Sequence, residues 1–421
     1  MNVCQKAVCR AVLLCCAFVP VNAQTGAQNN GQAGANGARA VRIDAQNSDS
    51  SSIVEKSDWM RYDNGKYIGH VYREVRASIV ALGGTGDAKL YKGHFFVMED
   101  TLRDMRSSAK AVNAMVPAQF RMFRDGSIEI DDDKGFPALR DFPVYANKAV
   151  EPGEKWTAPG ERALDPLNDG AVVVVPFLAE YEYKGIELYN GIPVHRISAR
   201  YASRYNFARI RPITFTNNYE KGLVQPFTGL SGKHDVDILI RVSNGALLLS
   251  RDNLDETFTW ADGKTVRFRG FTLVFGQGIQ PMNKDAVIAG ISPGIEGANG
   301  ISVSKVDEGI RLTLQDIQFK PDSSELLAGE TERLKVIAAA LAAVHDRTFL
   351  VEGHTAQAGT AGGEQELSVA RAKRIVDELC ALGIEAGRFI YKGWGSAKPA
   401  ASNSTEEGRK LNRRVEITII E

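Results

Sequence analysis

The sequence predicts a multidomain α+β protein, in which an antiparallel β-rich domain, a curved sheet or half-barrel, precedes a smaller α/β sandwich. Its length is the first reason, since 421 residues exceed what one hydrophobic core usually serves. The second is a series of Asn-Gly and Asp-Gly pairs before residue 300, each flanked by β-forming residues. The third is the change after residue 300, where apolar residues recur at helical spacing between short strands.

Residues 1–23 predict an export signal. Two basic residues precede the apolar run 11–19, which is too short to span a bilayer, and a small-residue cleavage site ends at Ala23. A buried N-terminal helix is one alternative. Cleavage before Cys16 with lipidation there is another, and it would anchor the mature protein to a membrane.

Charge and cysteine content exclude several classes of protein. Lys+Arg and Asp+Glu both number 51, so no basic field indicates a nucleic-acid partner. Four of the five cysteines lie inside the predicted signal, so cleavage leaves only Cys380 and no internal disulfide. Its apolar neighbours indicate a packing role.

Residues 24–52 are rich in Gln, Asn, Gly, Ala and Ser, which predicts a flexible linker. The β-rich domain then covers 53–300, where five pairs predict hairpin turns because both residue types tolerate positive φ. These pairs are Asn64-Gly65, Asp125-Gly126, Asn190-Gly191, Asn244-Gly245 and Asp262-Gly263.

Three details of this domain are less regular. Residues 109–120 are a weak helical candidate, and the proline-rich stretch 136–160 predicts a division into two subdomains. An outer-membrane barrel is an alternative for the domain. The acidic run 131–134 and the proline-rich stretch interrupt the alternating apolar pattern that membrane strands need, so the sequence favours a soluble curved sheet.

Residues 301–421 predict a β-α-β-α-β-β sandwich. The strands of this order are expected at 310–319, 349–352, 389–392 and 414–420, and a further strand at 301–306 precedes them. One helix carries an apolar stripe of Leu334, Ile337, Ala338, Leu341 and Val344, and a second begins at about Glu364.

No pattern typical of catalysis is present. The sequence contains no HExxH, no GxSxG and no phosphate-binding loop with its lysine, and its six histidines lack metal-ligand spacing with carboxylates. We therefore expect no catalytic residue, no metal and no cofactor, and His195 and His234 are interpreted as ordinary sheet residues.

One constellation predicts a binding site for a small acidic ligand. Gly353 and Gly359 let the chain turn at a strand's exit and approach a ligand, and the loop ends at a helix start whose free N–H groups favour an anion. Arg371 can meet a carboxylate with a bidentate fork.

A second loop and the last strand supply further donors, Asn403, Arg409, Asn412 and Arg413. The alternative is that Arg409, Arg413 and Arg414 are solvated or paired with Glu406 and Glu407, and this alternative is preferred for Arg414.

Six separated segments carry a resemblance to a known family. They are IQFKPDSSEL, VEGHTAQAG, ELSVARAKRI, GWGSAKP, Asn403 and GRKLNRRVEI. In this order and spacing they resemble the OmpA-like peptidoglycan-binding domain over about residues 305–421. The β-rich domain resembles, more loosely, domains that accompany such modules in spirochaetes.

The resemblance implies a pocket for the zwitterionic end of the diamino acid in the peptidoglycan stem peptide. By position, Arg371 takes the carboxylate, and the family's ammonium-binding aspartate, directly after Gly353-His354-Thr355, is Ala356 here. The other family positions fall on Asp322, Glu364 and Arg413.

With Ala356 in place of the family's aspartate, one of the two charged side chains that bind the ligand is missing. A charge-assisted hydrogen bond is worth about 1.5–3 kcal/mol, so its loss should weaken binding roughly 10- to 150-fold. One hypothesis is that Glu364 replaces the missing aspartate from the other side of the loop. The alternative is that Glu364 only complements the dipole of its helix.

These observations predict an exported protein of the periplasm or outer membrane that binds peptidoglycan non-covalently and supports envelope integrity. Association with the outer membrane is the further expectation. The alternative is a divergent scaffold that has lost wall binding, while the β-rich domain binds a lipid or protein partner.

Overall fold

The computed structural model describes residues 40–45, 50–100, 110–206, 212–214, 225–278, 282–295, 300–344 and 347–421. The predicted signal, including Cys16, lies outside these residues. Ala40–Glu421 form one compact unit. Within the described residues, no helix combines the length and the apolar character that crossing a bilayer requires.

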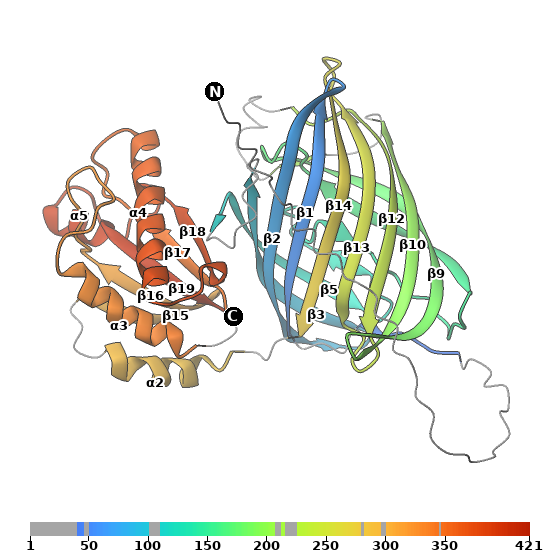
Figure 1. The fold of residues 1–421 in the computed structure, drawn as a ribbon, viewed down its shortest axis with the longest axis horizontal. Helices are drawn as coiled ribbons and strands as arrows, with labels where there is room; N and C mark the ends of the chain where they lie inside the picture. The colour runs from blue at the N-terminus through green and yellow to red at the C-terminus, as the bar shows by residue number, and fades with distance from the viewer. Residues whose placement is uncertain are drawn as a thin grey trace, which may run out of the picture. The chain divides into compact units, whose positions relative to one another are not determined.

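The first part of the chain forms a large, curved, nearly closed sheet (Figure 1). Across the sheet the strands are β6 (Ile128–Ile130), β5 (Ala114–Phe123), β3 (Ala88–Asp100), β2 (Lys66–Thr85), β1 (Ser50–Asp63), β14 (Thr265–Gly278), β13 (Leu247–Thr259), β12 (Gly229–Arg241), β10 (Ile192–Asn206), β9 (Ala171–Tyr189), β8 (Lys155–Leu164) and β7 (Leu139–Arg140). The short β11 (Pro212–Thr214) pairs with β9. The first strand of this sheet along the chain, β1, pairs with the last, β14.

All five predicted turns join paired antiparallel strands. Asn64 and Gly65 have φ values of 48° and 81°, and Asn190 and Gly191 have 49° and 80°. A type I′ turn needs positive φ at both central residues, which asparagine and glycine adopt with least strain. The predicted antiparallel β-rich architecture is therefore confirmed.

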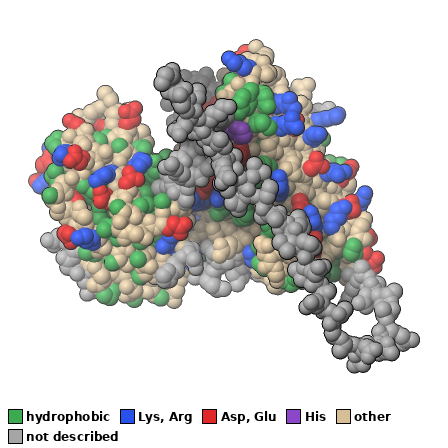
Figure 2. Space-filling model, viewed as in Figure 1, with side chains coloured by type: hydrophobic (Ala, Val, Ile, Leu, Met, Phe, Trp, Pro, Cys, Tyr) green, Lys and Arg blue, Asp and Glu red, His purple; other side chains and the backbone are tan. Residues whose placement is uncertain are grey.

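The two faces of this sheet differ because side chains alternate along each strand. On β9, Phe177, Tyr181 and Tyr183 are buried, whereas Glu180 is exposed between them. Charged side chains spread over the outer face (Figure 2). This alternation fits the curved antiparallel sheet that the sequence predicts.

The proline-rich stretch 136–160 does not separate two subdomains, because strands on both sides of it belong to the same sheet. It contains β7 and the start of β8, which form one edge of that sheet, and its other residues reach towards the β5–β6 turn at the opposite edge. Its Tyr145 N–H donates to the carbonyl of Asp125 at 2.7 Å, and the Ala163 N–H of β8 donates to the carbonyl of Ala138 at 2.7 Å. The stretch thus narrows the gap that the strands leave open.

The last part of the chain has the predicted α/β elements. A sheet in the order β15 (Ile301–Val306), β16 (Gly309–Gln315), β19 (Arg414–Ile420), β17 (Phe349–Gly353) and β18 (Phe389–Gly393) packs against α3 (Glu330–Ala342) and α4 (Ala361–Ala381) (Figure 1). The predicted stripe of α3 is in this core. Cys380 is a free thiol packed beside the core, as predicted.

Two short helices had no clear sequence signal, α5 (Glu406–Asn412) and α2 (Lys284–Ile295). Ile291 and Ile295 of α2 are buried in the core of the C-terminal sandwich. The C-terminal domain therefore includes α2 and begins before residue 301, where the sequence pattern placed its start.

Two further expectations were wrong. Residues 109–120 contain no described helix. Strand β5 and the short β4 (Lys110–Ala111) occupy this stretch, because β4 pairs in parallel with β18 and β5 pairs with β3. Residues 40–45 and 50–52 of the predicted linker are part of the fold, since Val41 and Val150 exchange two backbone hydrogen bonds of 2.9 and 2.8 Å, Ile43 is buried, and β1 begins at Ser50.

Candidate functional site

Helix α4 positions Arg371 at the edge of the C-terminal core. Its Nε donates to the carbonyl oxygen of Ser323 at 3.0 Å, and its guanidinium carbon lies 4.8 Å from the ring centroid of Phe319. Among the described residues, no carboxylate comes within ion-pair distance of this half-buried cation. Burial lowers the pKa of Arg371 below its usual value, because no ion pair within the described residues compensates the cation for its loss of solvent.

Asp322 and Arg413 lie in the electrostatic range of Arg371, as the sequence prediction requires. The charge of Asp322 favours the Arg371 cation, and that of Arg413 opposes it. Asp322 is exposed and has a φ of 48°. Arg413 donates to Glu406 at 2.9 Å, so this predicted anion grip is already ion-paired.

The loop after β17 is buried at its start. His354, Thr355 and Ala356 are 3%, 5% and 7% exposed. The His354 N–H donates to the carbonyl of Arg414 at 3.0 Å, and the Thr355 N–H donates to the carbonyl of Gly395 at 2.9 Å. These contacts attach the loop to its own domain.

The rest of the loop is held by side chains. The N–H of Gln357 donates to Oδ1 of Asn403 at 3.1 Å, and the N–H groups of Ala358 and Gly359 both donate to Oε1 of Glu364 at 2.8 Å. The predicted function of this loop as a row of backbone donors for a ligand is therefore wrong for these amides, because the chain's own acceptors occupy them.

Glu364 is committed to the loop. Besides the two amides, its Oε2 accepts a hydrogen bond from the hydroxyl of Ser396 at 2.5 Å, and the side chain is buried. This hydroxyl and the amide of Gly359 lower the pKa of Glu364, which keeps it ionised. The helix itself is capped by Thr360, whose side chain accepts from the Gly363 N–H. Glu364 is therefore neither a free replacement for the aspartate nor the helix cap.

Asn403 also has a structural task. Its Oδ1 accepts from Nδ2 of Asn412 at 2.8 Å as well as from Gln357. Arg409 donates to the carbonyl of Asn403 at 3.0 Å and pairs with Glu406. A continuous set of contacts therefore connects the loop after β17 with α5.

The two glycines of the motif differ. A Cβ on Gly353 would lie 2.3 Å from the carbonyl oxygen of Ser368, so β17 and α4 approach closely only because this residue is glycine. A Cβ on Gly359 would meet nothing within 4 Å. The close approach at Gly353 is therefore to the protein's own helix, whereas the predicted approach of both glycines to a ligand stays a prediction.

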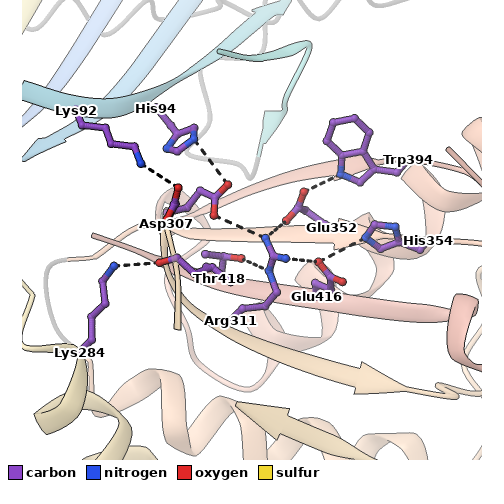
Figure 3. A network of polar contacts seen from close by, with 12 residues as sticks. Lys92, His94, Lys284, Asp307, Arg311, Glu352, His354, Trp394, Glu416 and Thr418 are labelled. Atoms are coloured by element: carbon purple, nitrogen blue, oxygen red, sulfur yellow. Dashed lines mark hydrogen bonds and ion pairs between the residues drawn. The ribbon is translucent and has the colours of Figure 1, made fainter. Parts of the chain in front are cut away.

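His354 belongs to a polar network on the strands (Figure 3). Its Nε2 is 3.8 Å from Glu416, which also lies 3.2 Å from Arg311 of β16. Burial, with the nearby Arg414 charge, lowers the pKa of His354 to about 3, so the ring is neutral. Arg414 pairs with Glu416 at 2.7 Å rather than with Glu406 or Glu407. The partners Ser396 and Glu416 lie within the segments GWGSAKP and GRKLNRRVEI, but neither was predicted as a site residue.

The structure thus brings together Arg371, Asp322 and Arg413 at one place and joins Asn403 and Glu364 to the loop that carries Ala356. In the described residues, no group of three or more His, Cys, Asp or Glu side chains is arranged to hold a metal ion.

Comparisons with known proteins identify the domain. Residues 318–413 match the OmpA family. The outer-membrane lipoprotein YfiB of Pseudomonas aeruginosa is 32% identical over 132 residues, which cover 28% of this chain and 79% of that protein. The chain belongs to the OmpA family.

Other relatives match over the same domain. The peptidoglycan-binding protein ArfA of Mycobacterium tuberculosis is 39% identical over 103 residues, covering 24% of this chain and 32% of ArfA. The match thus spans about a third of that relative's length. A solved cell wall anchor of the T6SS from Pseudomonas aeruginosa is 32% identical, covering 32% of this chain and 96% of that one, with a TM-score of 0.29.

Proposed function

We propose that this OmpA-family protein is a non-enzymatic envelope component that binds peptidoglycan through its C-terminal domain. Export to the periplasm or outer membrane, as the N-terminal sequence predicts, would place the domain beside the cell wall. A relative of this domain is named a peptidoglycan-binding protein. The ligand would be the carboxylate of the diamino acid in the stem peptide.

The half-buried guanidinium of Arg371 is the observation that carries the proposal. Its Nε is used by Ser323 and one face by Phe319, and no carboxylate of the described residues neutralises it. A ligand carboxylate would supply the missing countercharge and accept from the two terminal nitrogens. Asp322, which lies in electrostatic range, could attract the ammonium of the same zwitterion.

The binding is expected to be weak. Ala356 places a methyl group where the family has its aspartate, and the Glu364 carboxylate is held by Ala358, Gly359 and Ser396. One charge-assisted contact is therefore missing, which corresponds to roughly 10- to 150-fold in affinity. Tethering of the protein near the wall would raise the effective concentration and offset part of this loss.

Co-sedimentation of the mature chain with purified sacculi tests the proposal. Arg371→Leu should lower the bound fraction at least tenfold, whereas Lys373→Leu should not, since Lys373 is an exposed cation of the same helix that pairs with Asp377. Ala356→Asp should increase binding. Equal sedimentation of the Arg371→Leu and wild-type chains would refute the assignment of Arg371.

A scaffold that has lost wall binding is the second candidate function. The observation in its favour is that the loop donors and the Glu364 carboxylate are satisfied within the domain. In that case the wild-type chain remains in the supernatant with sacculi, and the β-rich domain carries the binding activity.

A further inference from the structure

The inner face of the N-terminal sheet lines a cavity of two adjacent chambers, which share several wall residues. The larger has a volume of about 260 Å³ and the smaller about 110 Å³. Residues from β1, β2 and the stretch between the sheet edges line both chambers, among them Glu55, Val75, Phe136 and Phe142. Together the chambers reach the size range of small-molecule pockets, about 300–1,000 Å³.

The larger chamber is apolar. Its wall consists mainly of aliphatic and aromatic side chains from facing strands, including Ile53, Ile79, Phe95, Phe120, Ile240 and Leu247. An alkyl chain is the guest that this wall suits, because it buries apolar surface without leaving a polar group unpaired.

The smaller chamber combines aromatic rings with charges. Trp59, Tyr201, Phe258 and Phe268 line it beside the carboxylates of Glu55, Asp165, Asp252 and Glu256. Aromatic faces and carboxylates together form the environment that binds organic cations, including quaternary ammonium groups. Arg73 and Arg162 are the two guanidinium groups of the same lining.

Arg162 is occupied by its own neighbours. Its Nη1 lies 2.6 Å from Oε1 of Glu256 and 3.0 Å from Nε2 of His234. Burial opposes a charge on Glu256, but Arg162 and His234 outweigh burial and hold the pKa of Glu256 well below its usual value. His234 in turn contacts Asp252 at 2.8 Å. These groups compensate one another without a ligand.

Two acceptors in the chamber are not satisfied in this way. Oδ1 of Asp252 is buried and has no hydrogen-bond partner. Glu55 makes no hydrogen bond or ion pair with the described residues, although protein surrounds it and the surface it retains faces the cavity. Burial raises the pKa of Glu55, and the charge of Arg73 opposes this shift. Nε of Arg73 is a buried donor without a hydrogen-bond partner.

We propose that this cavity binds a single-chain amphiphile with a cationic head, an amine or a quaternary ammonium, whose alkyl chain fills the larger chamber. The head lies among the aromatic rings and contacts Glu55 and the unpartnered Oδ1 of Asp252. A head that also carries a phosphate would place it at Arg73. This inference concerns the N-terminal sheet and does not depend on wall binding.

Titration of the full mature chain with four twelve-carbon probes tests the proposal, with bound stoichiometry read by native mass spectrometry and affinity by calorimetry below the micelle threshold. Dodecyltrimethylammonium and dodecylphosphocholine should bind one per chain. Laurate and dodecyl maltoside should bind at least tenfold more weakly. Tighter binding of dodecylphosphocholine than of dodecyltrimethylammonium would identify a phospholipid-type head as the source.

Two variants and a control complete the test. Glu55→Gln should remove the preference for the cationic probes, and Val75→Trp, which fills both chambers, should remove binding of all four. Glu180→Gln changes an exposed carboxylate of β9 and should behave as wild type. Equal affinity for laurate, an unchanged preference in Glu55→Gln, or full binding by a folded Val75→Trp chain would each overturn the proposal.

Discussion

Glu364 determines how the loop after β17 is held, and replacing it tests that geometry. The alanine variant loses three hydrogen bonds, two of 2.8 Å from backbone amides and one of 2.5 Å from Ser396. Ala358 and Gly359 are exposed, so water can take over their N–H groups. Each bond is therefore worth about 0.5–1.5 kcal/mol, and Glu364→Ala should destabilise the closed loop by about 2–4 kcal/mol. Glu364→Gln keeps one accepting oxygen and should cost about 1 kcal/mol.

Amide hydrogen exchange measures this loss where it occurs. Protection at Ala358 and Gly359 should fall about 30- to 1,000-fold in Glu364→Ala, since each 1.4 kcal/mol is a factor of ten. Glu366→Ala is the matched control, because Glu366 is an exposed carboxylate of the same helix. Unchanged protection in Glu364→Ala would refute the assignment of the carboxylate to the loop.

The glutamine variant separates this role from ligand binding. If the carboxylate only holds the loop, Glu364→Gln binds sacculi as well as the wild-type chain while the amides of Ala358 and Gly359 stay protected. Loss of wall binding with an intact loop would mean that the charge of Glu364 contacts the ligand after all.

Three further predictions concern stability. Glu256→Gln should cost about 3–5 kcal/mol in urea unfolding, because Arg162 is left buried without its carboxylate, and replacing both by apolar residues of similar size should recover most of the loss. As pH falls from 6.5 towards 3, His354 stays neutral in the folded chain, whereas the same residue of the unfolded chain takes up a proton. The free energy of unfolding should therefore drop by up to about 1.4 kcal/mol per pH unit. His354→Phe should flatten this slope. Gly353→Ala should cost about 1–3 kcal/mol in thermal unfolding because its Cβ meets a backbone oxygen of α4, while Gly359→Ala should stay within about 0.5 kcal/mol of wild type.

The sequence predicted the turns and helices correctly where neighbouring residues alone determine the local structure. A turn such as Asn64-Gly65 is specified by its own two residues, and the stripe on α3 by a spacing of three and four. Residues 109–120 were a weak helical candidate, but β5 pairs with β3 and β4 pairs with the distant β18, so strand pairing overrode the local pattern.

The loop of the OmpA-family domain shows why motif positions alone did not give its chemistry. The motif predicts which residues lie near the ligand, and in the structure Asp322 and Arg413 lie within electrostatic range of Arg371. It does not predict which polar groups the protein itself satisfies. Ser396 is 32 residues from Glu364, yet its hydroxyl helps to decide that this carboxylate is not free.

The charged cluster inside the N-terminal sheet is the strongest case of the same limit. His234 was interpreted as an ordinary sheet residue, and along the chain it lies 72 residues from Arg162, which lies 94 residues from Glu256. Only the curvature of the sheet brings these strands to one interior. Buried charges are expensive to keep unless they are paired. Sequestration of Arg162 leaves Glu55 and Oδ1 of Asp252 without a donor, and this is the basis of the proposed preference for a cationic ligand.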